Sequence, residues 1–214
     1  MMKNILTRLS LTKEGKLMRA SLDGDIAKVK TILNKGLDPN SRTKDGYVAL
    51  MGAALNGHLD IVRILLNAGA NPNIRFKDGR TALFGAVNQG HLDVVKTLLE
   101  AGADPNIKEK KEGQTPLHFA ADHDRSEIIK VLINHGADTE AGERHGEYTP
   151  LIFAVFRGHI KSVKVLLDAG ASPDAQGNDG KTPLDLSISL DFEEITRLLL
   201  RKSVEKYGQL KGKQ

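Results

Sequence analysis

The chain has 214 residues, of which 40% are hydrophobic and 27% charged, a composition typical of a soluble globular protein with one or two domains. It contains no cysteine, which excludes disulfides, thiolate metal sites and a cysteine nucleophile, and fits a reducing compartment. No run of about 18 apolar residues occurs, and the first residues, MMKNILTRLSLTKEGK, lack the continuous apolar core of a signal peptide, so we expect a cytoplasmic protein with no membrane partner.

The net charge of +4 is concentrated at the end of the chain. Residues 201–214 hold five basic side chains and one acidic side chain, so the rest of the chain balances at 26 basic against 26 acidic side chains. A basic C-terminal tail is most often a solubilising end. The alternative is that the tail binds nucleic acid or another anionic surface, with an affinity that depends strongly on salt. We do not favour nucleic acid as the partner.

Internal repeats organise the remainder of the sequence. A glycine recurs at intervals of 33, 33, 34 and 34 residues, at Gly36, Gly69, Gly102, Gly136 and Gly170, and closes segments such as ILLNAGAN and TLLEAGAD. A second column opens each unit, in segments such as QTPLHFAA and YTPLIFAV, at Val48, Thr81, Thr115, Thr149 and Thr182. A third marker, such as NGHLDIV, lies between the two columns. This regular spacing predicts a stack of similar supersecondary units.

Each unit is predicted to form two short helices followed by an extended loop, which we call a finger. Thr followed by Pro begins the first helix, because the hydroxyl accepts from a free N–H of the first turn and Pro has no N–H to satisfy. Leu117, Ala120 and Ala121 then form a narrow apolar stripe. A glycine such as Gly57 ends the first helix in a left-handed conformation. The second helix ends at the glycine of NAGAN, and the finger turns at an Asp-Gly pair.

These columns resemble the ankyrin repeat, with its 33-residue period, its TPLH start and its GAD.N end. The resemblance covers about residues 12–202. It implies an all-α fold, an ankyrin-repeat solenoid of stacked helix-turn-helix units with β-hairpin-like finger loops. It also implies protein binding, since partners of ankyrin repeat proteins generally bind the concave side formed by fingers and first helices.

We expect six repeats in a single domain, counting two capping repeats. In chain order they are an N-terminal capping repeat at 12–44, internal repeats at 45–77, 78–111, 112–145 and 146–178, and a C-terminal capping repeat at 179–202, followed by a basic tail at 203–214. The first repeat lacks the Thr-Pro start, and the last has polar Asp185, Ser187 and Ser189 on its first helix, as expected of caps. An alternative is that the chain belongs to a larger protein whose other domains act.

Two features depart from the repeat pattern. Gly52 and Gly85 lie inside first helices, at a cost of about 1 kcal/mol each. Either the side-chain bulk has moved to the preceding Met51 and Phe84, or the helices pack closely there. The fingers in IKEKKEG and AGERHGEYTP each carry one extra residue, which is either neutral drift in a surface loop or a contact loop for a partner.

The segment TPLHFAADHDR, residues 115–125, concentrates residue types used in acid–base catalysis and metal binding. His118, however, occupies a column that holds Met51 and Ile152 in other repeats, and in ankyrin repeats this histidine hydrogen-bonds locally to hold the turn. His123 lies about 140° around the helix from His118, too far to bind one ion with it. Since the sequence offers no nucleophile with its base and no set of three ligands, we expect no catalysis, metal or cofactor.

The resemblance implies three partner-binding positions in each repeat, one just before the Thr column and two late on the exposed side of the first helix. Those that we single out are Tyr47, Leu55, Asn56, Arg80, Asn88, Gln89, Gln114, Asp122, His123, Tyr148, Phe156, Arg157, Lys181 and Leu190. Tyr148, Phe156 and Arg157 come from one repeat and are expected to lie close together, and they are residue types enriched in binding hot spots. Alternatively, Phe156 packs on a neighbouring finger.

The sequence therefore predicts a monomeric, non-catalytic scaffold that holds a partner protein of unknown identity on a preformed surface. Binding of an anionic surface through the tail, or regulation of a partner enzyme, is the alternative. Replacement of Tyr148 and Phe156 together by Ala is expected to abolish partner binding.

Overall fold

The computed structural model describes residues 12–211, including the side chains of residues 12–206. The chain divides into two compact units, Met1–Ile107 and Lys108–Gln214, which we call the N-terminal and C-terminal units. We describe each unit by itself. The expectation that the chain begins without a signal peptide falls mainly on residues 1–11, which lie outside the described residues.

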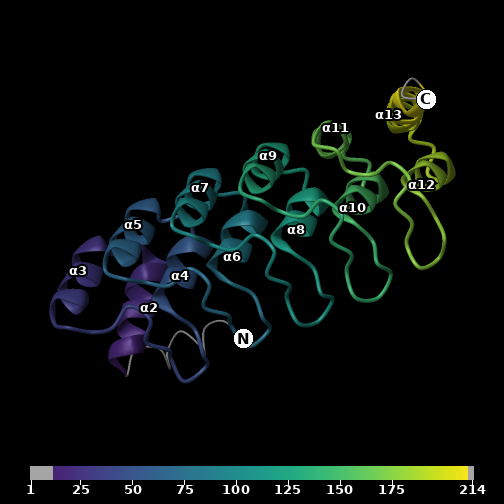
Figure 1. Cartoon of the computed structure of the whole chain (residues 1–214). Helices are drawn as coiled ribbons and strands as arrows, with labels where there is room; N and C mark the ends of the chain where they lie inside the picture. The colour runs from purple at the N-terminus through teal and green to yellow at the C-terminus, as the bar shows by residue number, and fades with distance from the viewer. Residues whose placement is uncertain (1–11, 212–214) are drawn as a thin grey trace. The chain divides into compact units, whose positions relative to one another are not determined.

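The N-terminal unit consists of three helix pairs. They are α2 (Lys13–Asp23) with α3 (Ile26–Asn34), α4 (Ala49–Leu55) with α5 (Leu59–Asn67), and α6 (Ala82–Gln89) with α7 (Leu92–Glu100). The first helices α2, α4 and α6 pack side by side in one row, and the second helices α3, α5 and α7 form a second row, drawn above the first in Figure 1. A finger projects from the row of first helices between successive pairs.

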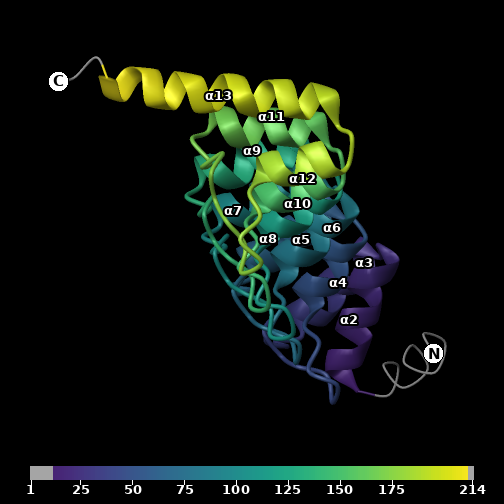
Figure 2. The ribbon, with the colours of Figure 1, turned by 90° about the vertical axis from the view of Figure 1, so that its right-hand side faces the viewer.

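The C-terminal unit repeats this plan with α8 (Pro116–Asp122) and α9 (Ser126–Asn134), α10 (Pro150–Phe156) and α11 (Ile160–Asp168), and α12 (Pro183–Ser189) and α13 (Glu193–Lys211). Helices α8, α10 and α12 form the first row, and α9, α11 and α13 the second. Figure 2 shows that α13 is longer than α11 and runs past its end. Residues 12–211 contain twelve helices and no strand, which confirms the predicted all-α fold.

The first helices begin where the Thr column predicts. The Thr149 side chain accepts from the Ile152 N–H, and the Thr182 side chain accepts from the Asp185 N–H at 3.1 Å. The Asp185 carboxylate in turn accepts from the Thr182 N–H at 2.9 Å, which completes a capping box. Pro follows each of these two threonines at the first helical position, where a missing N–H costs nothing.

Gly57 shows why glycine follows the first helices α2, α4, α6 and α10, whereas Asp124 and Asp191 take the left-handed conformation after α8 and α12. The φ of Gly57, +73°, lies in the left-handed region, which glycine adopts at little cost. A Cβ at this position would also lie only 2.6 Å from the Nδ1 atom of His91, in the next repeat. Glycine is therefore required both by the turn and by the histidine that packs over it.

Side chains that follow the second helices join neighbouring repeats in the N-terminal unit. The Asn40 amide donates to the Gly69 carbonyl at 2.9 Å, and its oxygen accepts from the Asn71 N–H at 2.7 Å. Asn73 makes the same pair of bonds one repeat later, with Gly102 and Asp104. These bonds satisfy backbone groups just beyond the ends of the second helices, and they join each repeat to the next.

The two glycines inside first helices allow close packing between helices. A Cβ on Gly52 would lie 3.0 Å from the Met18 sulfur in α2, and a Cβ on Gly85 would lie 3.4 Å from the Leu55 Cα in α4. The close-packing interpretation is thus supported at both positions. Phe84, directly before Gly85, is fully buried, so apolar bulk also stands one position earlier there.

The end of the chain differs from the predicted basic tail. Helix α13 continues without interruption from the last repeat to Lys211, so residues 203–211 are helical. The Lys202 ammonium lies 2.9 Å from the Asp168 carboxylate, and the Lys206 ammonium lies 2.9 Å from the Asp174 carboxylate. Residues 203–211 thus extend the last helix, and Lys202 and Lys206 pair with carboxylates of the preceding repeat. Residues 212–214 lie outside the described residues.

Candidate functional site: the ends of the first helices and the fingers

The predicted partner-binding residues divide between the two units. Tyr47, Leu55, Asn56, Arg80, Asn88 and Gln89 belong to the N-terminal unit, and Gln114, Asp122, His123, Tyr148, Phe156, Arg157, Lys181 and Leu190 belong to the C-terminal unit. Three of them are large apolar side chains that remain exposed: Phe156 at 57%, Leu55 at 40% and Leu190 at 38%. All three lie at the C-terminal ends of first helices.

Phe156, the most exposed aromatic side chain among these positions, lies beside charged and polar side chains. The Arg157 guanidinium lies 6.0 Å from the centre of the Phe156 ring. The same guanidinium donates to the Asp122 carboxylate at 2.7 Å, from the neighbouring helix α10 to α8. His123 is exposed, with its Nδ1 atom 3.7 Å from that carboxylate. We call Asp122, His123, Phe156 and Arg157 the Phe156 patch.

The Asp122 contact fixes the cation of the patch. The hydrogen bond and the charge of Asp122 raise the pKa of Arg157 above its ordinary value, so the guanidinium stays charged. Because Arg157 is already held in place, a partner that contacts it loses less side-chain entropy than it would with a freely rotating arginine. An apolar ring beside an ordered cation is a combination typical of binding hot spots.

Tyr148 lies apart from this patch. It precedes helix α10, whereas Phe156 ends it, and the eight intervening steps correspond to about 12 Å along a helix axis. The Tyr148 ring covers Gly177 of the next finger so closely that a Cβ there would overlap it. A hydrogen bond to Asp179 raises the pKa of the Tyr148 hydroxyl. The expectation that Tyr148 joins Phe156 and Arg157 was therefore wrong, because its ring packs along the fingers.

The other finger-base positions of the C-terminal unit serve the fingers themselves. The Gln114 carbonyl accepts from the Glu109 N–H at 2.9 Å, and the Lys181 carbonyl accepts from the Gly177 N–H at 3.2 Å. The Lys181 side chain is exposed, and its ammonium lies 3.8 Å from the Asp179 carboxylate. The backbone carbonyls of Gln114 and Lys181 are thus used within the fingers, and a partner can contact these residues through their side chains.

The candidate residues of the N-terminal unit form two groups. At the fingers, the Tyr47 ring stacks on Phe76 with 4.1 Å between centroids, and the Arg80 guanidinium lies 3.6 Å from the Asp78 carboxylate. At the helix ends, Leu55 is exposed beside Asn56, whose amide donates to the Leu22 carbonyl of the preceding repeat at 2.8 Å. Asn88 is half-buried and Gln89 is exposed at the end of α6.

The histidines that recur after the first helices act as structural bridges. The Nε2 atoms of His58, His91 and His159 lie 3.0 to 3.2 Å from backbone carbonyl oxygens of the preceding repeats. Since a carbonyl can only accept, Nε2 carries the proton in each ring and donates it. Sequence reasoning identified this column as scaffold, and the structure supplies the bond that it makes.

His118 is also structural. It is fully buried, and its Nδ1 atom accepts from the Thr115 N–H at 3.1 Å, which confirms the expected local bond. Its Nε2 atom donates to the Tyr148 carbonyl at 3.0 Å, so it also holds the finger of the next repeat. Burial lowers the pKa of His118 from 6.5 to about 4, so the ring is neutral at neutral pH. His123, by contrast, is exposed and bonds the Phe119 carbonyl.

Buried glutamates organise the two fingers that carry an extra residue. Glu109 is only 3% exposed, and its carboxylate accepts from the N–H groups of Lys111, Glu112 and Gln114 at 2.5 to 3.2 Å. Burial raises the pKa of Glu109, but hydrogen bonds from backbone N–H groups outweigh it and hold this pKa below its ordinary value. In the next finger, Glu143 accepts in the same way from the N–H groups of His145 and Gly146. The extra residues are thus part of ordered loops.

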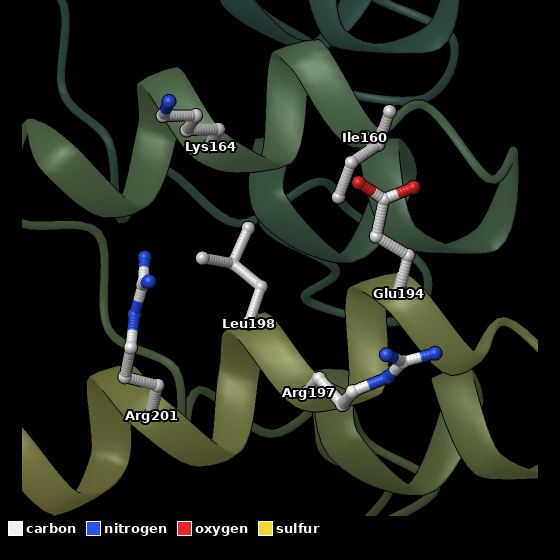
Figure 3. Close-up of a pocket in the computed structure, with 6 residues that line it drawn as sticks. All are labelled: Ile160, Lys164, Glu194, Arg197, Leu198 and Arg201. Atoms are coloured by element: carbon white, nitrogen blue, oxygen red, sulfur yellow. The ribbon is translucent and has the colours of Figure 1, made fainter.

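A hollow of about 380 Å³ lies between the second helices α11 and α13, away from the fingers. Figure 3 shows Leu198 and Arg201 pointing from α13 toward α11, near Ile160 and Lys164. The lining of the hollow has one carboxylate, Glu194, with the cationic side chains of Lys164, Arg197 and Arg201, and no histidine or hydroxyl group. Within the described part of the chain, no three His, Asp or Glu side chains converge on a point that could hold a metal ion.

Sequence reasoning missed a group of charges in the N-terminal unit. Arg42, Lys44, Arg75 and Lys77 lie on two adjacent fingers and are all exposed. Outside the tail, basic and acidic side chains were counted only over the whole chain, where their numbers are equal, so this local excess was not seen. A charge count for each finger would have found it.

Comparison with known proteins agrees with this architecture. A family model for ankyrin repeats, built as three copies, matches residues 17–109, 103–177 and 143–209. No curated protein matches the chain. Among residues 12–211, no helix combines the length and the apolar character needed to cross a bilayer. Because the overlapping family matches together span residues 17–209, the chain belongs to the ankyrin repeat family.

Proposed function

We propose that this protein is a monomeric, non-catalytic module that binds a protein partner through the ends of its first helices and its fingers, with the Phe156 patch as a main contact. Ankyrin repeats generally mediate protein–protein interaction. The cysteine-free sequence supports a reducing, cytoplasmic compartment for this binding.

The observation that carries the proposal is the exposure of Phe156. Helix α10 buries Ile152 and Val155 on its packed side, yet leaves 57% of Phe156 exposed beside an arginine that Asp122 holds in place. Neighbouring packing does not require this ring, so its position supports a role in contact with another molecule. A bound partner would remove the exposed 57% of this side chain from water, with a gain of about 1 to 2 kcal/mol.

The test is capture of partners by the full chain from its native lysate, followed by affinity measurement with the purified partner. The variant Phe156→Ala is expected to weaken binding by about tenfold or more. Val204→Ala is the matched control, because Val204 is 70% exposed on α13 and a variant there also removes exposed apolar surface. Equal affinity of Phe156→Ala and wild type for every captured partner would refute the assignment of the patch.

The structure does not favour nucleic-acid binding through the C-terminal end. Two of the lysines on which that alternative depends, Lys202 and Lys206, lie 2.9 Å from the carboxylates of Asp168 and Asp174. A phosphate would have to replace these carboxylates to use either lysine. Whether the captured partner is an enzyme whose activity changes on binding is decided by assay of that partner with and without the protein.

A further inference from the structure

The fingers of the N-terminal unit carry an excess of positive charge. Residues 42–47 and 75–80, which we call the basic finger pair, hold five basic side chains and two acidic ones: Arg42, Lys44, Arg75, Lys77 and Arg80 against Asp45 and Asp78. All five basic residues are exposed. At the equivalent positions of the repeats in the C-terminal unit, the three fingers 108–114, 142–148 and 176–181 hold five basic and five acidic residues. The excess is therefore specific to one pair of fingers.

Contacts between the two fingers join these charges into one surface. The Tyr47 ring of the first finger stacks on Phe76 of the second, with 4.1 Å between centroids and 21° between ring planes. The Arg42 guanidinium donates to the Arg75 carbonyl at 2.9 Å and to the Gly46 carbonyl at 3.3 Å. Lys77 lies over the tip of the first finger, because a Cβ on Gly46 would be 3.6 Å from the Lys77 Cε. The cations are thus held on a preformed frame.

Each finger of the pair also carries one acidic residue, Asp45 in the first and Asp78 in the second. Burial, followed by the charges of Asp45 and Asp78, raises the pKa of the Tyr47 hydroxyl. Asp78 also pairs with Arg80 at 3.6 Å. The guanidinium of Arg42 is held by carbonyl oxygens, which orient it without cancelling its charge. The exposed lysines Lys44 and Lys77 complete a surface with a net charge of +3.

We propose that the basic finger pair is a docking surface for an acidic segment of a protein partner. The proposal rests on the proposed function, to which it adds the chemistry of the partner. Exposed cations on a rigid frame attract carboxylates over a distance of about 8 Å at physiological salt, and so accelerate encounter and select partners by charge. The half-buried Tyr47–Phe76 pair, which joins the two fingers, adds apolar surface beside these cations.

The geometry favours a polypeptide over nucleic acid as the occupant. Proteins bind single-stranded nucleic acid by stacking bases on the faces of aromatic rings. Tyr47 and Phe76 already cover one face of each other. A continuous phosphate backbone would also pass the carboxylates of Asp45 and Asp78, which repel it. An acidic peptide can alternate carboxylates with backbone N–H and apolar groups, and thus match both the cations and the two aspartates.

The test measures binding of a labelled probe to the full chain by fluorescence anisotropy at low salt. The probes are a twelve-residue peptide of Glu and Ser, the same peptide with Gln in place of Glu, and a twelve-nucleotide thymidine strand. The test variant is the double substitution Lys44→Ser with Lys77→Ser. The control is Lys110→Ser with Lys111→Ser, which removes the same charge from exposed positions on a finger of the C-terminal unit. Circular dichroism checks that each variant is folded.

The proposal predicts that the Glu peptide binds the wild type, that the test variant weakens this binding by about tenfold, and that the control changes it by less than about twofold. Equal losses in the two variants would overturn it, because the effect would then follow net charge alone. The proposal would also be overturned if the Glu peptide did not bind, if the Gln peptide bound as tightly as the Glu peptide, or if the thymidine strand bound more tightly than the Glu peptide. None of these outcomes depends on the Phe156 patch, so failure here is distinguishable from failure of the proposed function.

Discussion

The fingers of the two units are closed by different hydrogen-bond acceptors. In the N-terminal unit, the Thr43 hydroxyl accepts from the Tyr47 N–H at 3.0 Å, and ring stacking joins adjacent fingers. In the C-terminal unit, the carboxylates of Glu109 and Glu143 accept from several N–H groups, and His118 holds the base of the next finger. A carboxylate that accepts several bonds can close a longer loop, so the scaffold tolerates an extra residue there.

The two units also differ in whether the charged side chains of their fingers are buried or exposed. The C-terminal fingers use two of their acidic residues inside the loops, where they are buried, while the N-terminal fingers are closed mainly by neutral groups. The N-terminal fingers consequently expose cations with few carboxylates beside them. We therefore expect pH to change the stability of the C-terminal unit through its buried ionisable groups. In the N-terminal unit, we expect the exposed cations to select partners by charge.

The largest expected effect concerns acid. His118 is neutral when folded, with a pKa of about 4, and takes up a proton near pH 6.5 when unfolded. Stability from this group is therefore complete above pH 6.5 and is lost as the pH falls toward 4, by about 3 kcal/mol. Urea unfolding from pH 7.5 to 4 measures it. His118→Met, a substitution chosen because Met51 occupies the same column, is expected to lack this component, and parallel pH curves for the two proteins would contradict the assignment.

The second prediction compares the two ways of closing a finger. Glu109→Ala removes a carboxylate that accepts three N–H bonds, and is expected to cost about 2 to 3 kcal/mol in the free energy of unfolding. Thr43→Ala removes one hydroxyl acceptor and is expected to cost about 1 kcal/mol. Both are measured by urea unfolding at neutral pH. A larger loss for Thr43→Ala would show that the buried glutamate does not hold its finger.

The smallest effect separates the two finger tyrosines. Tyr148→Phe loses the hydroxyl bond to Asp179 and is expected to cost about 1 kcal/mol. Tyr47→Phe keeps the stack on Phe76 and removes a hydroxyl that lies near two carboxylates, so the expected change is below about 0.5 kcal/mol. Thermal unfolding of both variants provides the comparison. Equal losses would mean that both tyrosines are held by the same kind of contact.

The repeat columns were sufficient to predict the fold because each element depends on local chemistry. Thr182 begins a helix through a bond to a residue three positions away, and Gly57 ends one through its own φ. His118 could be recognised as structural from its column, and its bond to Thr115 is also local. The exposure of Phe156 followed from its position late in a first helix, where three other repeats hold the polar residues Asn88, Asp122 and Ser189.

Contacts between repeats could not be predicted in the same way. The position of the Tyr148 ring depends on Gly177 and Asp179 in the next finger, whose approach no single repeat defines. The helical state of residues 203–211 was missed because their charge suggested a tail. The pairing of Lys202 with Asp168, 34 positions earlier, is one signal that appears only once the repeats are stacked.

Hydroxyl-radical footprinting of the protein with its captured partner tests the central claim, that binding uses the ends of the first helices and not the second helices. The matched reporters are Phe156 on α10 and Leu200 and Val204 on α13, all strongly exposed apolar side chains of the C-terminal unit. We expect the partner to protect Phe156 from oxidation and to leave the oxidation of Leu200 and Val204 unchanged. Protection of Leu200 and Val204 with Phe156 unaffected would contradict it.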